Sequence, residues 1–166
     1  MSDDAEVIRA KRFELVDDDG KVRAALIALT DGSPGLLFRD ANGNPQVMLS
    51  LLPDGSPGLG LRDRAGTQRV WVGISSDGSP AITLSSPDGK PRAAFGTQPD
   101  GSPGLTLYDD QGRQRLTLAC WGADGSPGLS LYGANEMLRA ALGTHPDGSP
   151  ELMLLDANAK PLFSAP

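Results

Sequence analysis

One tetrapeptide, DGSP, recurs six times in this chain of 166 residues. The intervals between successive copies are 23, 23, 23, 24 and 23 residues, and the copies begin at Asp31, Asp54, Asp77, Asp100, Asp124 and Asp147. A fixed period of this length indicates a repeat architecture, in which one small unit is stacked many times. We therefore expect a single β-repeat domain over 1–166, with units at approximately 7–30, 31–53, 54–76, 77–99, 100–123, 124–146 and 147–166.

A second turn marker runs in phase with the first. It is a tetrad that ends in glycine, such as DDDG at 17–20 or DRAG at 63–66, and its glycines are Gly20, Gly43, Gly66, Gly89 and Gly112. The last two copies have changed to GANE at 133–136 and DANA at 156–159. An aspartate followed by a left-handed glycine predicts a type I turn with a G1 bulge. The Asp-Gly of DGSP is a two-residue hairpin signal.

Between the markers, large apolar residues stand two apart. After DGSP the two slots hold Phe13, Leu36, Leu59, Ile82, Leu105, Leu129 and Leu152, then Leu15, Phe38, Leu61, Leu84, Leu107, Leu131 and Leu154. After the tetrad they hold Ala24, Val47, Val70, Ala93, Leu116, Ala140 and Phe163, then Leu26, Leu49, Val72, Phe95, Leu118, Leu142 and Ala165. A period of two predicts strands that direct these residues into a core. Gly or Pro interrupts the chain too often for stable helices.

The fold class predicted is all-β: seven tandem hairpin repeats that form an extended antiparallel meander. A two-layer β-solenoid is the alternative. In a solenoid the DGSP aspartates would stack about 4.8 Å apart and repel one another, whereas in a meander that distance is roughly doubled. Each DGSP proline is expected to begin a strand at the sheet margin, where its missing N–H is tolerated.

The residues that alternate with the apolar slots carry little charge. A single-layer sheet with such a face marks an interaction surface, and its open edges invite further pairing. Three arrangements cover it: chains that associate, possibly as a trimer; a sheet that folds back on itself as a monomeric sandwich; or a sheet that wraps another molecule. We favour association of the chain with itself into a homo-oligomer.

Two stretches carry a resemblance to known repeats. RFELVDDDGKVRAAL (12–26) and GLTLYDDQGRQRLTL (104–118) resemble bacterial tandem-repeat proteins of this hairpin type, which mostly have no assigned function. The segment YDDQG (108–112) is similar to the YD repeat of Rhs-type shells, where hairpins build a winding sheet. The resemblance implies an extended β-sheet and implies no activity, because the YD pattern lacks both DGSP and the 23-residue period.

Catalytic and metal chemistry have few candidate residues. His145 and Cys120 are the single histidine and cysteine, which leaves no disulfide, no nucleophile–base pair of those types and no plausible zinc ligand set. We therefore expect no enzyme and no cofactor. Calcium at the Asp-rich stretches 17–20 and 109–110 stays open, although aspartates that cap their own turns explain them more simply. A possible interaction surface comprises Trp71, Tyr108, Trp121 and Tyr132.

Charge and termini narrow the class further. The formal net charge is −6 and no basic stretch is present, which argues against nucleic acid as a partner. The sequence shows no signal peptide and no apolar run of the roughly 20 residues that span a bilayer. We expect a cytoplasmic protein without membrane partners, with a virion part or non-classical export left open. The expected function is a structural or scaffold protein of a fibre, shaft or shell; a glycan- or protein-binding repeat module is the alternative.

Overall fold

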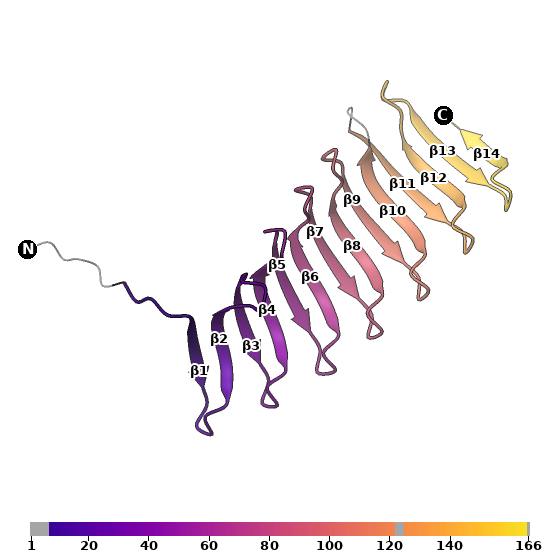
Figure 1. Cartoon of the computed structure of the whole chain (residues 1–166). Coiled ribbons are helices and arrows are strands. Elements are labelled where there is room, and N and C mark those ends of the chain that lie inside the picture. Colours follow the sequence, from indigo (N-terminus) through magenta and orange to yellow (C-terminus); the bar gives the residue numbers. More distant parts are fainter. Residues whose placement is uncertain (1–6, 122–124, 166) are drawn as a thin grey trace, which may run out of the picture.

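The computed structural model describes residues 7–121 and 125–165, and these residues form one antiparallel sheet. Its 14 strands follow one another in chain order, β1 to β14, so the predicted hairpin meander is confirmed and the solenoid alternative is wrong. The turns alternate between two long edges of a twisted ribbon (Figure 1). No helix that could cross a membrane occurs in the described residues.

The strands of the first run in each unit are short and nearly equal in length. They are β1 (Arg12–Val16), β3 (Pro34–Arg39), β5 (Pro57–Arg62), β7 (Pro80–Ser85), β9 (Pro103–Tyr108), β11 (Ser126–Tyr132) and β13 (Pro150–Leu155). The strands of the second run are β2 (Val22–Ala28), β4 (Pro45–Leu51), β6 (Gln68–Ile74), β8 (Pro91–Thr97), β10 (Gln114–Trp121), β12 (Leu138–Thr144) and β14 (Pro161–Ala165). Five of the first-run strands begin at the DGSP proline, as predicted.

Both edges of the ribbon are built from the same turn. At the tetrad of the third unit, the Asp63 N–H donates to Thr67 (2.9 Å) and the Gly66 N–H donates to Asp63 (2.9 Å). At the next DGSP, the Ser75 N–H donates to Ser79 (2.9 Å) and the Gly78 N–H to Ser75 (2.8 Å). The φ angles of Gly66 and Gly78 are 84° and 86°. Each is a type I turn closed by a left-handed glycine, which confirms the prediction for the tetrads.

For DGSP the two-residue interpretation is wrong. A two-residue type I′ turn needs positive φ at both central residues, and among the described residues no aspartate has one. The aspartate is instead the third residue of a four-residue turn, one position before the glycine. The DGSP that begins at Asp124 is only partly covered, because Asp124 itself lies outside the described residues.

The apolar slots line up across the whole sheet. Cross-strand pairing joins Phe13 to Leu26, Leu26 to Leu36 and so on as far as Ala165, which makes one continuous row near the DGSP edge. A parallel row runs from Leu15 through Ala24 and Phe38 to Phe163 near the other edge. We call the surface that carries these two rows the ladder face. Directly opposed side chains of this kind are the unit of stabilisation in an antiparallel sheet.

The ladder face does not close over a core within one chain, which corrects the expectation from the sequence. Leu26, Phe95 and Leu142 expose 50%, 57% and 54% of their surface. No described side chain is fully buried, and the buried hydrophobic residues are Ala25, Leu37 and Ala119. These three stand in the slots that were expected to face outward. The reason for the exposure is geometric: a single layer has nothing above the side chains of its ladder face.

We call the opposite surface the small-residue face. A row near the DGSP edge consists of glycine, alanine and serine, and it pairs across ten strands: Gly35, Ser50, Gly58, Gly73, Ala81, Gly96, Gly104, Ala119, Gly128 and Gly143. The indoles of Trp71 and Trp121 lie over this row. A Cβ added at Gly58 would stand 3.1 Å from the Trp71 ring, and one at Gly128 would stand 2.4 Å from the Trp121 ring. These rings therefore cover the bare backbone at Gly58, Gly73 and Gly128.

Candidate interaction surfaces

The ladder face leaves an unusual amount of surface in contact with water. The chain exposes 10967 Å². A compact monomer of 17.3 kDa exposes about 7,800 Å² by the usual scaling. The excess of about 3,000 Å² belongs to both faces of the single layer and to the exposed residues before β1. Obligate homodimer interfaces bury about 2,000–5,000 Å², summed over both partners. An exposed apolar surface of this extent marks a site of interaction.

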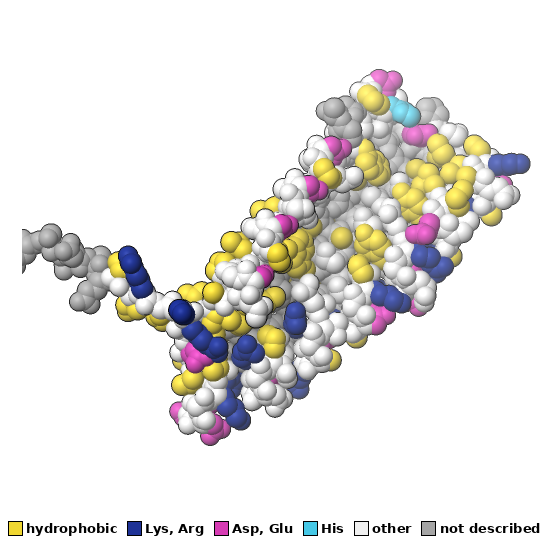
Figure 2. Space-filling view, viewed as in Figure 1, with side chains coloured by type: hydrophobic (Ala, Val, Ile, Leu, Met, Phe, Trp, Pro, Cys, Tyr) yellow, Lys and Arg dark blue, Asp and Glu magenta, His cyan; other side chains and the backbone are white. Residues whose placement is uncertain are grey.

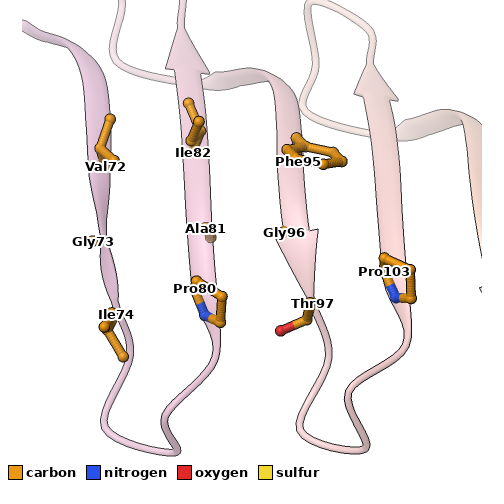
Figure 3. A pocket seen from close by; sticks show the side chains of 10 residues that line it. All are labelled: Val72, Gly73, Ile74, Pro80, Ala81, Ile82, Phe95, Gly96, Thr97 and Pro103. Atoms are coloured by element: carbon orange, nitrogen blue, oxygen red, sulfur yellow. The ribbon is translucent and has the colours of Figure 1, made fainter.

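The ladder face is hollowed where β6 to β9 meet the DGSP edge. The hollow has a volume of 370 Å³ and is lined almost entirely by carbon. Val72, Ile82 and Phe95 form one row across three neighbouring strands, and Ile74, Pro80, Thr97 and Pro103 form a second row nearer the turns (Figure 3). The DGSP prolines thus contribute apolar surface to the ladder face as well as beginning strands. The hollow is a local deepening of a continuous apolar surface, and the Thr97 hydroxyl is the one polar side-chain group among the residues that line it.

The two edges of the ribbon differ in charge. We define the DGSP rim as the turns 29–33, 52–56, 75–79, 98–102 and 145–149, and the tetrad rim as the turns 17–21, 40–44, 63–67, 86–90, 109–113, 133–137 and 156–160. The described turns of the DGSP rim contain aspartates and no Lys or Arg. The tetrad rim combines its aspartates with Lys and Arg in the turns and at the strand ends. In Figure 2 acidic side chains follow one long edge, and blue side chains gather along the other.

On the tetrad rim, arginines join three of the aspartates to a neighbouring hairpin. Arg69 donates from Nη1 to Asp63 (3.3 Å) and from Nε to the carbonyl of Ser85 (2.8 Å). Arg23 and Arg115 repeat this arrangement with Asp17 and Asp109. These positions recur every second unit, a longer period that the sequence reading missed. The signal was available, because an arginine stands six residues after the tetrad aspartate in each case.

The aspartates of both rims accept hydrogen bonds from their own turns. The N–H of Ser102 donates to Asp100, which with the Ser102 hydroxyl holds the pKa of that carboxyl below its usual value. Desolvation of Asp109 works to raise its pKa, but the N–H groups of Arg113 and Gln111 and the Arg113 side chain lower it to about 2. Of the carboxylates that were considered as calcium ligands, Asp17 and Asp109 cap their own turns. Within the described residues, no three acidic, His or Cys side chains are grouped as metal ligands.

Two of the four candidate aromatic residues line the same hollow. Trp121 and Tyr132 line a hollow of 380 Å³ on the small-residue face, together with Gln98, Gln114, Thr106 and Thr117. Trp71 lies over Gly58 and Gly73, outside this hollow. Tyr108 pairs with Gln114 across β9 and β10 and is not among the lining residues. The four residues therefore do not all line one hollow.

The histidine and the cysteine lie apart. His145 belongs to the DGSP rim, where its Nε2 stands 3.6 Å from Glu151. Cys120 is half-buried on the ladder side of β10, next to Pro127 of β11. Neither residue has the nucleophile or base partner that a catalytic pair requires among its described contacts.

Comparisons with known proteins do not assign the chain to a family. No family model matches the chain, and no curated protein matches it. Among solved structures, it is similar to the TCP domain of SAS-4 from Drosophila melanogaster, which was solved in complex with a proline-rich motif of Ana2. The identity is 19%, over 89% of this chain and 94% of that one, with a TM-score of 0.28. A superposition that loose carries no argument about fold or function.

Proposed function

We propose that this chain is a structural β-repeat protein that associates with itself through the ladder face and performs no catalysis. The observation that carries the proposal is the pair of unbroken apolar rows across all 14 strands, left half exposed in a single chain. At about 25 cal/mol per Å², covering even part of the excess surface stabilises an assembly by many kcal/mol. Edge pairing of β1 with β14 would extend the ribbon but would leave these rows in water.

The first test is the mass of the protein in solution. Light scattering coupled to size exclusion is expected to give a multiple of 17.3 kDa, and the unfolding midpoint is expected to rise with protein concentration. A monodisperse monomer at every concentration, with a midpoint that does not depend on concentration, contradicts the proposal. The two readouts together keep the test decisive even for variants that fold only when assembled.

Adjacent residues of one strand supply matched variants. Phe95→Glu and Leu49→Glu place a charge on the ladder face, whereas Ala94→Glu and Met48→Glu place the same charge on the opposite face of β8 and β4. We expect the first pair to dissociate the assembly, since an unpaired charge is costly to bury. We expect the second pair to leave the mass unchanged. If the second pair dissociates the assembly and the first pair does not, the contact is made by the small-residue face, and the proposal is wrong.

A glycan-binding module is the second candidate, and the hollow around Trp121 and Tyr132 favours it. Aromatic faces stack on sugar rings, and the amides and hydroxyls that line this hollow offer donors and acceptors. Trp121→Ala and Tyr132→Ala are expected to abolish binding in a glycan panel, with Trp71→Ala as the control outside the hollow. Absence of binding by the unmodified protein across the panel removes this candidate.

A further inference from the structure

We propose that the copies assemble parallel and in register, about a rotation axis that runs along the ribbon, so that the DGSP rim of one copy lies beside the tetrad rim of the next. This inference rests on the proposed function, because it specifies how the ladder faces meet. The occupant of each ladder face is therefore a second copy of the same chain. The relation between the rims is the same whether two copies or three surround the axis.

Two ways of stacking identical ribbons face to face must be distinguished. Rotation about the long axis places β1 over β1 of the partner and brings opposite rims together. Rotation about an axis parallel to the strands places β1 over β14 and brings like rims together. Packed sheets lie about 10 Å apart, so either choice leaves the facing rims within about one Debye length at physiological salt.

The first argument for the parallel arrangement is charge. With like rims together, the DGSP aspartates Asp31, Asp54, Asp77, Asp100 and Asp147 face a copy of the same row, and the described turns of that rim offer no Lys or Arg. With opposite rims together, each of these rows faces the tetrad rim, whose turns hold five Lys and Arg against ten Asp and Glu. The strand ends beside those turns add seven arginines, which gives that rim 12 basic against 10 acidic residues: Arg23, Arg39, Arg62, Arg69, Arg92, Arg115 and Arg139. Juxtaposed like charges disfavour a partner and opposite charges favour it, so the parallel arrangement is selected.

The second argument is the size of the apolar side chains. Three of the four alanines in the two apolar rows, Ala24, Ala93 and Ala140, stand in the row near the tetrad rim. Their strand neighbours in the other row are Leu26, Phe95 and Leu142, which are among the most exposed residues of the face. Parallel stacking sets these three large residues against the partner's three alanines on the same strands. Like-rim stacking loses this complementary packing, because it sets the row near the DGSP rim, which holds one alanine, against a copy of itself.

Distances between spin labels test the orientation directly. In a Cys120→Ser background, Asp18→Cys and Pro87→Cys each place one label at the second position of a tetrad turn, the first between β1 and β2 and the second between β7 and β8. In the parallel assembly both labels give the same distance, about 25–30 Å, set by the width of the ribbon. In the like-rim assembly they differ: about 60 Å at the end, from twelve strand spacings, and about 10 Å at the centre.

The outcomes separate this inference from the function on which it rests. Equal distances at both positions support the parallel arrangement. A long distance for Asp18→Cys with a short one for Pro87→Cys overturns it while leaving self-association intact. A monomeric mass with no dipolar coupling at either position overturns the proposed function itself. Light scattering of the labelled proteins accompanies the measurement, so that a variant that fails to assemble is recognised.

Discussion

The DGSP rim and the tetrad rim turn the chain through the same backbone geometry, but they differ in what is attached to the turn. On the tetrad rim the aspartate is the first residue and accepts two N–H groups, as Asp63 does from Ala65 and Thr67. On the DGSP rim it is the third residue and accepts one, as Asp77 does from Ser79. The conformation of these tetrad turns is therefore held by two hydrogen bonds to the aspartate. That of the DGSP turns has one such bond and depends more on glycine and proline.

The two rims also differ in whether the turn glycine is present in every copy. The glycine has been replaced in two tetrads, and Glu136 and Ala159 occupy the left-handed position with φ angles of 58° and 61°. At Ala159 the cap remains, because Asp156 accepts the N–H groups of Asn158 and Lys160. Every DGSP has kept its glycine. The turn that contains Glu136 begins with Gly133 and has no aspartate cap; its Met137 N–H donates to Asn135.

The largest effect is expected from the close approach of strands near the DGSP rim. A Cβ at Gly96 would stand 2.4 Å from the carbonyl oxygen of Pro80 and 2.9 Å from Cα of Ala81. Backbone atoms cannot move aside as a side chain can, so Gly96→Ala should lower the unfolding free energy by about 1–3 kcal/mol. Gly104→Ala is the control, since its Cβ would meet Ala119 at 3.3 Å. Equal losses in urea denaturation would contradict this account.

The next effect compares the turns themselves. Gly66→Ala and Gly78→Ala should each cost about 1–2 kcal/mol, because both glycines have left-handed φ angles and an L side chain is strained there. The costs should be equal at the two rims despite their different sequences. Asp77→Gly should bring no gain, because Asp77 already has a negative φ. A gain there would restore the two-residue interpretation of DGSP.

Two substitutions to glycine in the replaced tetrads are expected to stabilise the protein. Glu136→Gly and Ala159→Gly should each raise the unfolding free energy by about 1 kcal/mol, through relief of the left-handed strain. Thermal unfolding of the single variants and of the double variant measures this. Asn135→Gly, one position earlier in the same turn, is the control and should bring no comparable gain. Unchanged midpoints would mean that the replaced tetrads have relaxed in another way.

Much of this fold follows from residue order alone. Apolar residues two apart, separated by turn residues every ten or so positions, define hairpins, and the 23-residue period sets their number. Which face is covered does not follow, because the rule that apolar residues lie in a core assumes a second layer. The burial of Ala25 and Leu37 depends on side chains of neighbouring strands, which no local pattern reveals.

The candidate surfaces could be predicted from the sequence less well than the fold. Trp121 and Tyr132 come together because β10 pairs with β11, while the similar residues Trp71 and Tyr108 lie elsewhere. The separation of charge between the rims requires knowing that the turns alternate between two edges. Once the meander is established, that separation can be read directly from the sequence, and it is the basis of the parallel assembly.

The smallest expected effect is a difference between the two rims in how stability depends on pH. The folded pKa of Asp109 is about 2 against an ordinary value of 3.8, so its contribution to stability is complete above about 4 and is lost as the pH falls toward 2. Asp109→Asn keeps an acceptor oxygen but removes the titration, and should flatten the loss of stability across that window. Asp100→Asn should flatten it less, because Asp100 accepts fewer hydrogen bonds and pairs with no arginine among its described contacts. Urea midpoints measured between pH 5 and pH 2 test this, and identical slopes for the two variants would show that the arginine contacts of the tetrad rim add nothing to its caps.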